Sequence, residues 1–278
     1  MNVAAFTAVV FAASALAGFL GALTGLGGGV VVTPVLTILL GVDLHYAMGA
    51  SLVSVIATSS GAAAAYVKEG FSNIRVGMFL EIATTIGAVA GAHLTAVIPT
   101  SALAVVFGAV LLYSAWHSIH GVTHGDGRTH DPLAQRLKLN GSYPGIDGVV
   151  RYQVSRVKAG FGLMFSAGLL SGLLGIGSGA MKVVAMDQIM GLPFKVSTTT
   201  SNFMIGVTAA AGAGVYLSRG YIDPGLAMPV MLGVLAGSLV GARGLAGTRT
   251  RALRLVFAAV VGVLALEMLY SGATGRFQ

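Results

Sequence analysis

Two ionisable residues, Lys182 and Glu81, lie inside long apolar stretches of the chain. If these stretches cross a membrane, a charged side chain at their centre costs about 2.5–3.5 kcal/mol on insertion scales and needs a partner. A bound anion would supply that counter-charge to Lys182, and a buried carboxyl group such as Glu81 can take up and release a proton. Two other interpretations stay open: Lys182 and Glu81 could form a structural pair, or the lysine could reach the membrane surface.

The apolar runs also contain hydrogen-bond donors, namely Ser51 and the consecutive residues Thr200, Ser201 and Asn202. Such groups can donate to an anion, or they can join helices to each other with no ligand present. We predict the first role, which makes them candidate substrate-binding residues. No H-E-x-x-H or G-x-S-x-G motif and no pair of membrane aspartates occurs. We therefore expect no enzymatic activity, no catalytic residue and no cofactor.

Two glycine-rich stretches, GLGGG from Gly25 and GIGSG from Gly175, precede short apolar runs. A helix that begins there presents unpaired amides and the positive end of its dipole, which favour an anion. The alternative is that these glycines only allow close packing of helices. A dinucleotide-binding loop is excluded, because no strand precedes the second stretch and Lys195 stands where an acidic residue is required. The candidate anion-binding positions are Gly27, Gly28, Gly29, Gly177, Ser178 and Gly179.

The composition places the chain in a membrane. Of its 278 residues, 55% are hydrophobic and 9% are charged, and the mean hydropathy is +0.87. A soluble domain carries about a quarter charged residues. We therefore predict an all-α integral membrane protein, with lipid and a small anion as partners. We interpret the net charge of +7 as a topology signal and expect no binding to nucleic acid.

Apolar runs of membrane-spanning character recur along the chain. The predicted segments are 3–24, 29–42, 46–67, 74–95, 99–120, 158–175, 179–191, 196–217, 223–242 and 252–272. A polar segment, 121–157, separates the fifth from the sixth. The predicted domains are a first transmembrane repeat (1–120), a cytoplasmic linker (121–157) and a second transmembrane repeat (158–278).

The two halves match each other at a constant offset of 150 residues. Gly29 falls on Gly179, Ser51 on Ser201 and Thr58 on Thr208, with further glycine pairs in the same register. Because each half has five segments and most Lys and Arg fall on one side of the predicted membrane, the repeats are predicted to be inverted, with both termini external. Such repeats are typical of secondary transporters that work by alternating access.

The second segment of each half is too short to cross a bilayer. About a dozen residues extend roughly 18 Å as a helix, against a hydrocarbon core of about 30 Å. We therefore predict two half-helices, each beginning at its glycine stretch, that enter from opposite sides and meet near the midplane.

One pattern, used twice, carries a resemblance to a known family. GLGGGVVVTPVL followed by AMGASLVSV corresponds to GIGSGAMKVVAM followed by GLPFKVSTTTSNF. The chain resembles the sulfite exporter TauE/SafE family over almost everything outside the linker. That resemblance implies export of small sulfur-containing oxyanions, sulfite or organosulfonates, across the plasma membrane of a prokaryote. Ser178 replaces a glycine of the pattern and Val184 stands where Pro34 stands in the first copy, which leaves the identity of the anion open.

Other functions compete with this interpretation. A passive anion channel can also be built from inverted repeats. His117, His120 and His124 have a spacing that faces one side of a helix, so a metal-ion transporter is a further alternative, although we predict no metal site. Proton coupling through Glu81 is a weaker addition to the main hypothesis. The oligomeric state is open, a homodimer included.

Overall fold

The structure is a computed structural model that describes residues 3–24, 29–68, 72–120, 131–145, 148–244 and 250–275. It is mainly helical, as expected for a chain whose backbone polar groups must be satisfied without water. Before the linker the elements are α1 (Val3–Thr24), α2 (Gly29–Pro34), η1 (Val35–Leu39), α3 (Leu44–Lys68), α4 (Ile74–Leu94) and α5 (Thr100–His120). After the linker they are α7 (Val157–Leu174), α8 (Gly179–Val184), η2 (Ala185–Ile189), α9 (Phe194–Ser218), α10 (Pro224–Gly244) and α11 (Thr250–Ala273).

The linker has regular structure of its own, which corrects the expectation of an all-α protein. It contains α6 (Pro132–Arg136) and an antiparallel hairpin of β1 (Gly141–Gly145) and β2 (Gly148–Tyr152). Gly145 and Gly148 flank the turn between the strands, and β2 has the β-branched and aromatic residues that favour strands. The sequence reading missed this hairpin because it is short and lies in a polar segment.

Each short apolar run forms a helix of about the predicted length. α2 continues directly into the π-helical turn η1, and α8 continues into η2 in the same way. Both end at a glycine with a left-handed backbone, Gly41 (φ 63°) and Gly191 (φ 72°). The next residue closes each end with the same hydrogen bond, from the Val42 amide to Leu36 (3.1 Å) and from the Leu192 amide to Met186 (2.9 Å).

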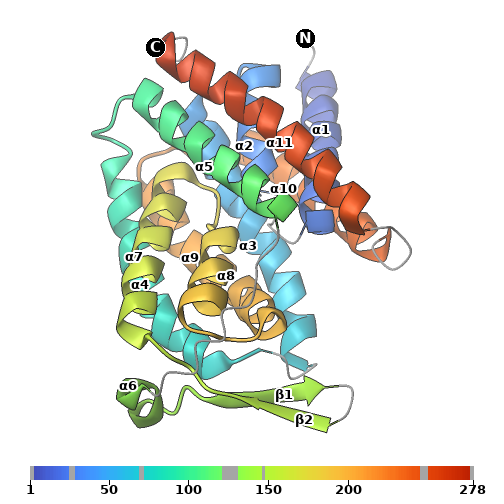
Figure 1. Cartoon of the computed structure of the whole chain (residues 1–278). Helices are drawn as coiled ribbons and strands as arrows, with labels where there is room; N and C mark the ends of the chain where they lie inside the picture. Colours follow the sequence, from blue (N-terminus) through green and yellow to red (C-terminus); the bar gives the residue numbers. More distant parts are fainter. Residues whose placement is uncertain are drawn as a thin grey trace.

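Helix packing follows the same order in both halves. α1 packs on α10, and the elements in the corresponding places, α7 and α4, pack on each other. α3 packs on α9, α5 on α11, and the contact of α4 with α9 has its counterpart in that of α10 with α3. In Figure 1, α1 begins near the end that holds both termini, whereas α7 begins beside the hairpin at the opposite end.

Glycines allow the tightest of these crossings. A Cβ atom at Gly87 would overlap the carbonyl oxygen of Phe165, and one at Gly237 would overlap that of Ala15. These two contacts are equivalent at the offset of 150. The first joins α4 to α7 and the second joins α10 to α1, so close packing explains these glycines.

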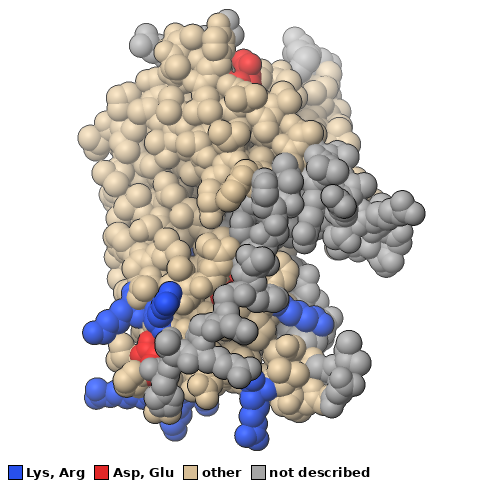
Figure 2. Space-filling view, in the orientation of Figure 1, with Lys and Arg blue, Asp and Glu red and all other residues tan. Residues whose placement is uncertain are grey.

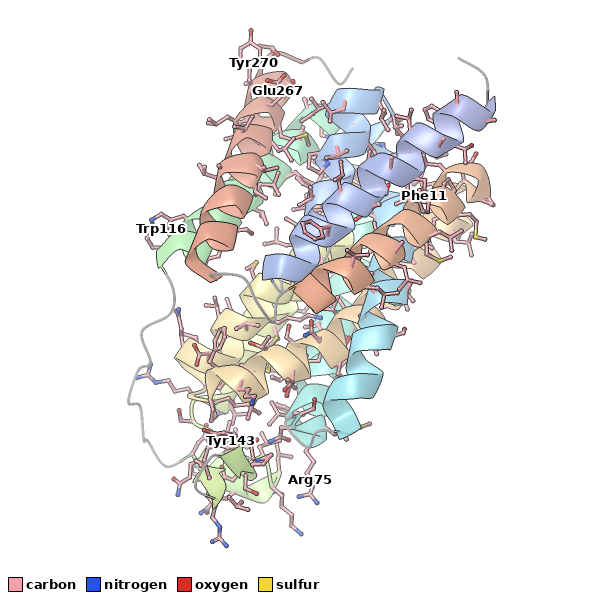
Figure 3. The ribbon with its side chains drawn as sticks, turned by 90° about the vertical axis from the view of Figure 1, so that its right-hand side faces the viewer. Phe11, Arg75, Trp116, Tyr143, Glu267 and Tyr270 are labelled. Carbon is pink, nitrogen blue, oxygen red and sulfur yellow. The ribbon has the colours of Figure 1, made fainter. Side chains whose placement is uncertain are left out.

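By length and apolar composition, two of the described helices, α4 and α7, could each cross a membrane, and several other apolar helices are shorter. Lys and Arg gather at the hairpin end of the face shown in Figure 2, whereas most of that face is uncharged. In Figure 3, Arg75 and Tyr143 lie at the hairpin end, and Glu267 and Tyr270 lie at the end with the termini.

Candidate functional site

The centre of the molecule is organised by α3 and α9, which hold the starts of the two short helices. The Ser51 hydroxyl on α3 donates to the carbonyl oxygen of Gly29 at 3.1 Å, and the Ser201 hydroxyl on α9 donates to that of Gly179 at 3.2 Å. The hydrogen bonds are equivalent in the two halves. In this arrangement the two hydroxyl protons fix the helix starts, so contact with an anion would require the hydroxyls to turn.

The starts of the two short helices lie beside each other. A Cβ atom built on Gly29 would be 3.8 Å from the carbonyl oxygen of Ile176, which belongs to the turn before α8. A Cβ atom on Gly177 would be 3.0 Å from both Val55 and Ile205. The glycines thus let this turn fit between α3 and α9 and reach the first residue of α2. Gly27 and Gly28 lie outside the described residues.

The turn before α8 has an unusual backbone. Gly175, Gly177 and Ser178 have φ values of 67°, 74° and 46°, which are left-handed. Ser178 is one of three non-glycine residues at positive φ in the described ranges, and it is buried with a hydroxyl group that has no hydrogen-bond partner. A left-handed non-glycine residue costs about 1–2 kcal/mol. A strained residue with an unsatisfied hydroxyl at a helix start is a candidate ligand contact.

Lys182 points from α8 toward α9 and is fully buried, with 0% of its surface exposed. Its Nζ donates to Oγ1 of Thr208 at 2.5 Å, and the Thr208 hydroxyl donates to Oε1 of Glu81 at 2.6 Å. Within the described part of the chain the lysine and the carboxyl group make no direct ion pair. They are linked through the Thr208 hydroxyl, which resembles the structural pair of Lys182 and Glu81 that the sequence allowed as an alternative.

The link leaves polar groups unused. An ammonium group has three N–H donors, and Lys182 uses one of them in its bond to Thr208. Oε2 of Glu81 is buried and has no hydrogen-bond partner. Thr85 also donates to Oε1, at 3.3 Å. Lys182 therefore has N–H groups that can donate to an anion, and Oε2 of Glu81 can take up a proton.

Sequence reasoning did not assign a role to Thr208, although it noted that the residue repeats Thr58. The signal available was that Lys182 and Glu81 are both polar, whereas the positions that correspond to them at the offset of 150 are apolar, Val32 and Met231. The Thr58 hydroxyl donates to carbonyl oxygens of its own helix, those of Ser54 and Val55. The polar link, which joins α8 and α9 of the second repeat to α4 of the first, therefore has no polar counterpart at the equivalent place formed by α2, α3 and α10.

A groove of about 450 Å³ reaches Glu81 from the outside of the bundle. Its walls are apolar and come from α4 and α9, and Thr85 lies beside the carboxyl group. The lining residues are Met78, Glu81, Ile82, Thr85, Ile86, Phe203 and Val207.

The remaining predicted residues lie elsewhere. The Thr200 hydroxyl accepts a hydrogen bond from the Asn73 amide at 3.0 Å, so it faces the start of α4 rather than α8. Asn202 is partly buried. His117 and His120 belong to the last turn of α5, their side chains and the whole of His124 lie outside the description, and the described residues contain no group of three or more potential metal ligands.

The linker packs against the starts of α4 and α7. The Asn73 side chain donates to the carbonyl oxygen of Leu139 (2.9 Å) and to the Tyr152 hydroxyl (2.8 Å). Burial raises the pKa of Tyr152. The carboxylate of Asp131 accepts from the amides of Leu133 (2.9 Å) and Val157 (2.8 Å), and these backbone bonds, that from Val157 first, hold its pKa below the usual value. Asp131 thus caps α6 and ties the linker to α7.

Comparison with known proteins identifies the family of the chain. The model of the sulfite exporter TauE/SafE family matches residues 10–268. The chain belongs to this family. It is similar to the probable membrane transporter protein YunE of Bacillus subtilis, with 26% identity over 265 residues that cover 92% of this chain and 95% of YunE.

Two further proteins of Bacillus subtilis are similar to this TauE/SafE member. The probable membrane transporter protein YdhB is 28% identical over 236 residues, covering 84% of this chain and 87% of YdhB. The probable membrane transporter protein YjnA is 26% identical over 271 residues, covering 91% and 95%. No solved structure gives a significant match. The chain is thus a membrane transporter of the TauE/SafE family.

Proposed function

We propose that this TauE/SafE protein is a secondary transporter that exports small sulfur-containing oxyanions, sulfite or organosulfonates, by alternating access. The observation that carries the proposal is the meeting of the two short-helix starts between α3 and α9, with the strained, unsatisfied Ser178 at one of them. Backbone amides at such starts attract anions. The binding site in this proposal comprises Gly27, Gly28, Gly29, Ser51, Gly177, Ser178, Gly179, Lys182, Ser201 and Asn202. Thr200, predicted from the sequence, is left out because its hydroxyl accepts from the backbone amide of Asn73 at the start of α4.

Lys182 supplies the positive charge in this site. Its ammonium group is fully buried and has N–H donors left after the bond to Thr208. A small movement of the lysine toward the turn before α8 would give an incoming oxyanion a charged hydrogen bond. Such bonds contribute about 1.5–3 kcal/mol.

Ten membrane segments in two inverted repeats would supply alternating access. The packing of α1 on α10 corresponds to the packing of α7 on α4, and this correspondence supports a repeat relation between the halves. The equivalent hydrogen bonds of Ser51 and Ser201 support it as well. The basic residues at the hairpin end support a cytoplasmic linker, with both termini external. In this topology the plasma membrane surrounds the apolar perimeter, and Glu81 is the proton-coupling carboxyl group.

Transport by purified protein in liposomes tests the proposal. We expect saturable exchange of labelled sulfite or methanesulfonate, whereas a passive channel would give steady conductance without counterflow. Ser178→Gly copies the residue of the first repeat and relieves the left-handed strain, so the variant should fold. It should weaken anion affinity roughly ten- to a hundredfold, the equivalent of one charged hydrogen bond.

Thermal stabilisation by the anion gives a second readout. Lys182→Met should abolish it, and Ser178→Gly should shift it to higher anion concentration. Unchanged affinity in both variants would exclude the proposed site. Transport that depends on a divalent metal and is lost in His117→Ala would favour the metal-ion alternative.

A further inference from the structure

We propose that Thr208 couples the anion to a proton, so that the transporter carries one proton together with each monovalent anion. The inference rests on the proposed function and specifies its coupling. It follows from the link of Lys182 through Thr208 to Glu81, a neutral unit when the lysine is charged and the carboxyl group is ionised.

The charge of the occupied site decides the stoichiometry. With a monovalent anion bound to Lys182, the site has one excess negative charge unless Glu81 takes up a proton. An uncompensated charge inside the membrane is strongly disfavoured, so the transporter would change conformation most readily in two states. One is empty and neutral, and the other holds an anion and a proton and is neutral as well.

No other described group near the link can easily take the proton. α4 contributes the hydroxyls of Thr84 and Thr85, α9 contributes Thr208, and α7 has Lys158 at its exposed start as its one ionisable side chain. Asp187 on η2 is the other buried acid of the described residues, but the hydrogen-bonded link runs from Lys182 through Thr208 to Glu81 and does not include it. Glu81, with a free Oε2 atom, is the available acceptor.

The Thr208 hydroxyl has two acceptors to choose between. It donates to Glu81 in the present structure, and the Met204 carbonyl oxygen lies 3.0 Å away as an alternative. When a proton from water binds to Glu81, the carboxylic acid can donate to the Thr208 oxygen, and the Thr208 proton can turn to Met204. Lys182 meanwhile donates to the anion instead of to Thr208. When the anion leaves, Lys182 returns to Thr208 and the proton leaves Glu81 for water, so protons and charges balance.

The chain provides a matched control in the other half. Thr58 occupies the equivalent position, bonds to carbonyls of its own helix and has Val32 and Met231 at the positions of the charged partners. A Thr→Val change there removes the same atoms from the same kind of helix. It should leave coupling intact.

Proteoliposomes that contain a pH-sensitive dye test the inference, with methanesulfonate as the probe because it stays monovalent at every pH used. Anion and proton fluxes are measured together while a potassium gradient with valinomycin sets the membrane voltage. We expect a proton-to-anion ratio near one and a rate that does not change with voltage. Thr208→Val should reduce proton-coupled flux at least tenfold, Thr208→Ser should restore most of it, and Thr58→Val should resemble wild type.

Glu81→Gln should exchange methanesulfonate without a dependence on the pH gradient. Gel filtration of each variant in detergent identifies loss of folding, and the Thr208→Ser comparison keeps the test decisive if Thr208→Val does not fold. Wild-type methanesulfonate flux without proton flux, or a proton ratio near one in Thr208→Val, would overturn the inference and leave the transport proposal standing. Absence of flux for every anion tested in wild type would overturn the proposed function, and the inference with it.

Discussion

Replacing the two ends of the buried link, singly and together, gives the sharpest stability prediction. The two hydrogen bonds limit the separation of Nζ of Lys182 from Oε1 of Glu81 to about 5 Å. At an effective dielectric constant of about 20, opposite charges at that distance attract by roughly 3 kcal/mol. Lys182→Met loses this attraction and leaves a buried carboxyl group, and Glu81→Gln leaves a fully buried ammonium group. Each change should cost about 3–5 kcal/mol.

The double variant should cost far less than the two single changes together, because it removes both charges. Replacing a whole buried ion pair with neutral groups is often close to neutral in stability. We therefore expect a coupling energy between the two positions of at least about 3 kcal/mol, the attraction between the two charges. The single variants should lose roughly 6–20 °C in Tm, at 2–4 °C per kcal/mol, and the double variant should regain most of it.

Unfolding in detergent can be followed by the amount of monodisperse protein that survives heating. Thiol-reactive dyes are unsuitable, because the chain contains no cysteine. Glu267→Gln is the control, because this acid lies at the end of the molecule that holds both termini (Figure 3) and accepts a hydrogen bond from the Ser271 hydroxyl at 3.4 Å. Strictly additive losses, or a Lys182→Met variant as stable as wild type, would refute an electrostatic link between the two residues.

Three other predictions concern packing, the linker and topology. Gly172→Ala should destabilise the protein by about 1–3 kcal/mol, because the new Cβ would overlap the backbone of α4, whereas Gly162→Ala on the same helix meets open space and should stabilise it by about 0.5–1 kcal/mol; thermal melting of both variants checks this. Asp131→Ala should cost about 1 kcal/mol at neutral pH. Because the folded pKa of Asp131 is lowered, its contribution is complete above the unfolded value of 3.8 and is lost as the pH falls through the lower folded value, so the wild-type and variant stabilities should converge in acid. Val149 in the hairpin and Val97 near the opposite end are 72% and 80% exposed, so each can be replaced by cysteine for labelling. An impermeant maleimide should label Val149→Cys from the cytoplasm and Val97→Cys from outside, and labelling of both from one side would contradict the topology.

The sequence predicted the helices well because apolar periodicity and glycine positions act locally. The short runs after Gly29 and Gly179 were expected to be helices of about a dozen residues, and each forms a continuous helix that ends next to a glycine. The linker hairpin could not be predicted in the same way. Its strands are five residues each, and its docking depends on contacts such as Asn73 with Tyr152, which are far apart in the chain.

The candidate site was predicted in its residue types more than in its geometry. Ser51 and Ser201 were expected near the glycine stretches and are found there, but their protons bond to backbone carbonyls. The sequence also could not show that Lys182 donates to Thr208 on α9. That direction follows from how α8, α9 and α4 pack, which brings Thr208 between the lysine and Glu81.

The two repeats share a backbone plan, but the two equivalent places around Thr208 and Thr58 differ in charge, and that difference bears on mechanism. A transporter built from two equal halves needs equivalent helix packing so that each conformation is a near mirror of the other in energy. It needs no second charged link, because one neutral unit of Lys182, Thr208 and Glu81 can serve both conformations if it lies near the centre. Val32 and Met231 at the equivalent positions keep the place around Thr58 free of a second lysine–acid pair. Placing a second lysine at Val32 should therefore abolish transport rather than double it, since the added charge has no acid opposite it.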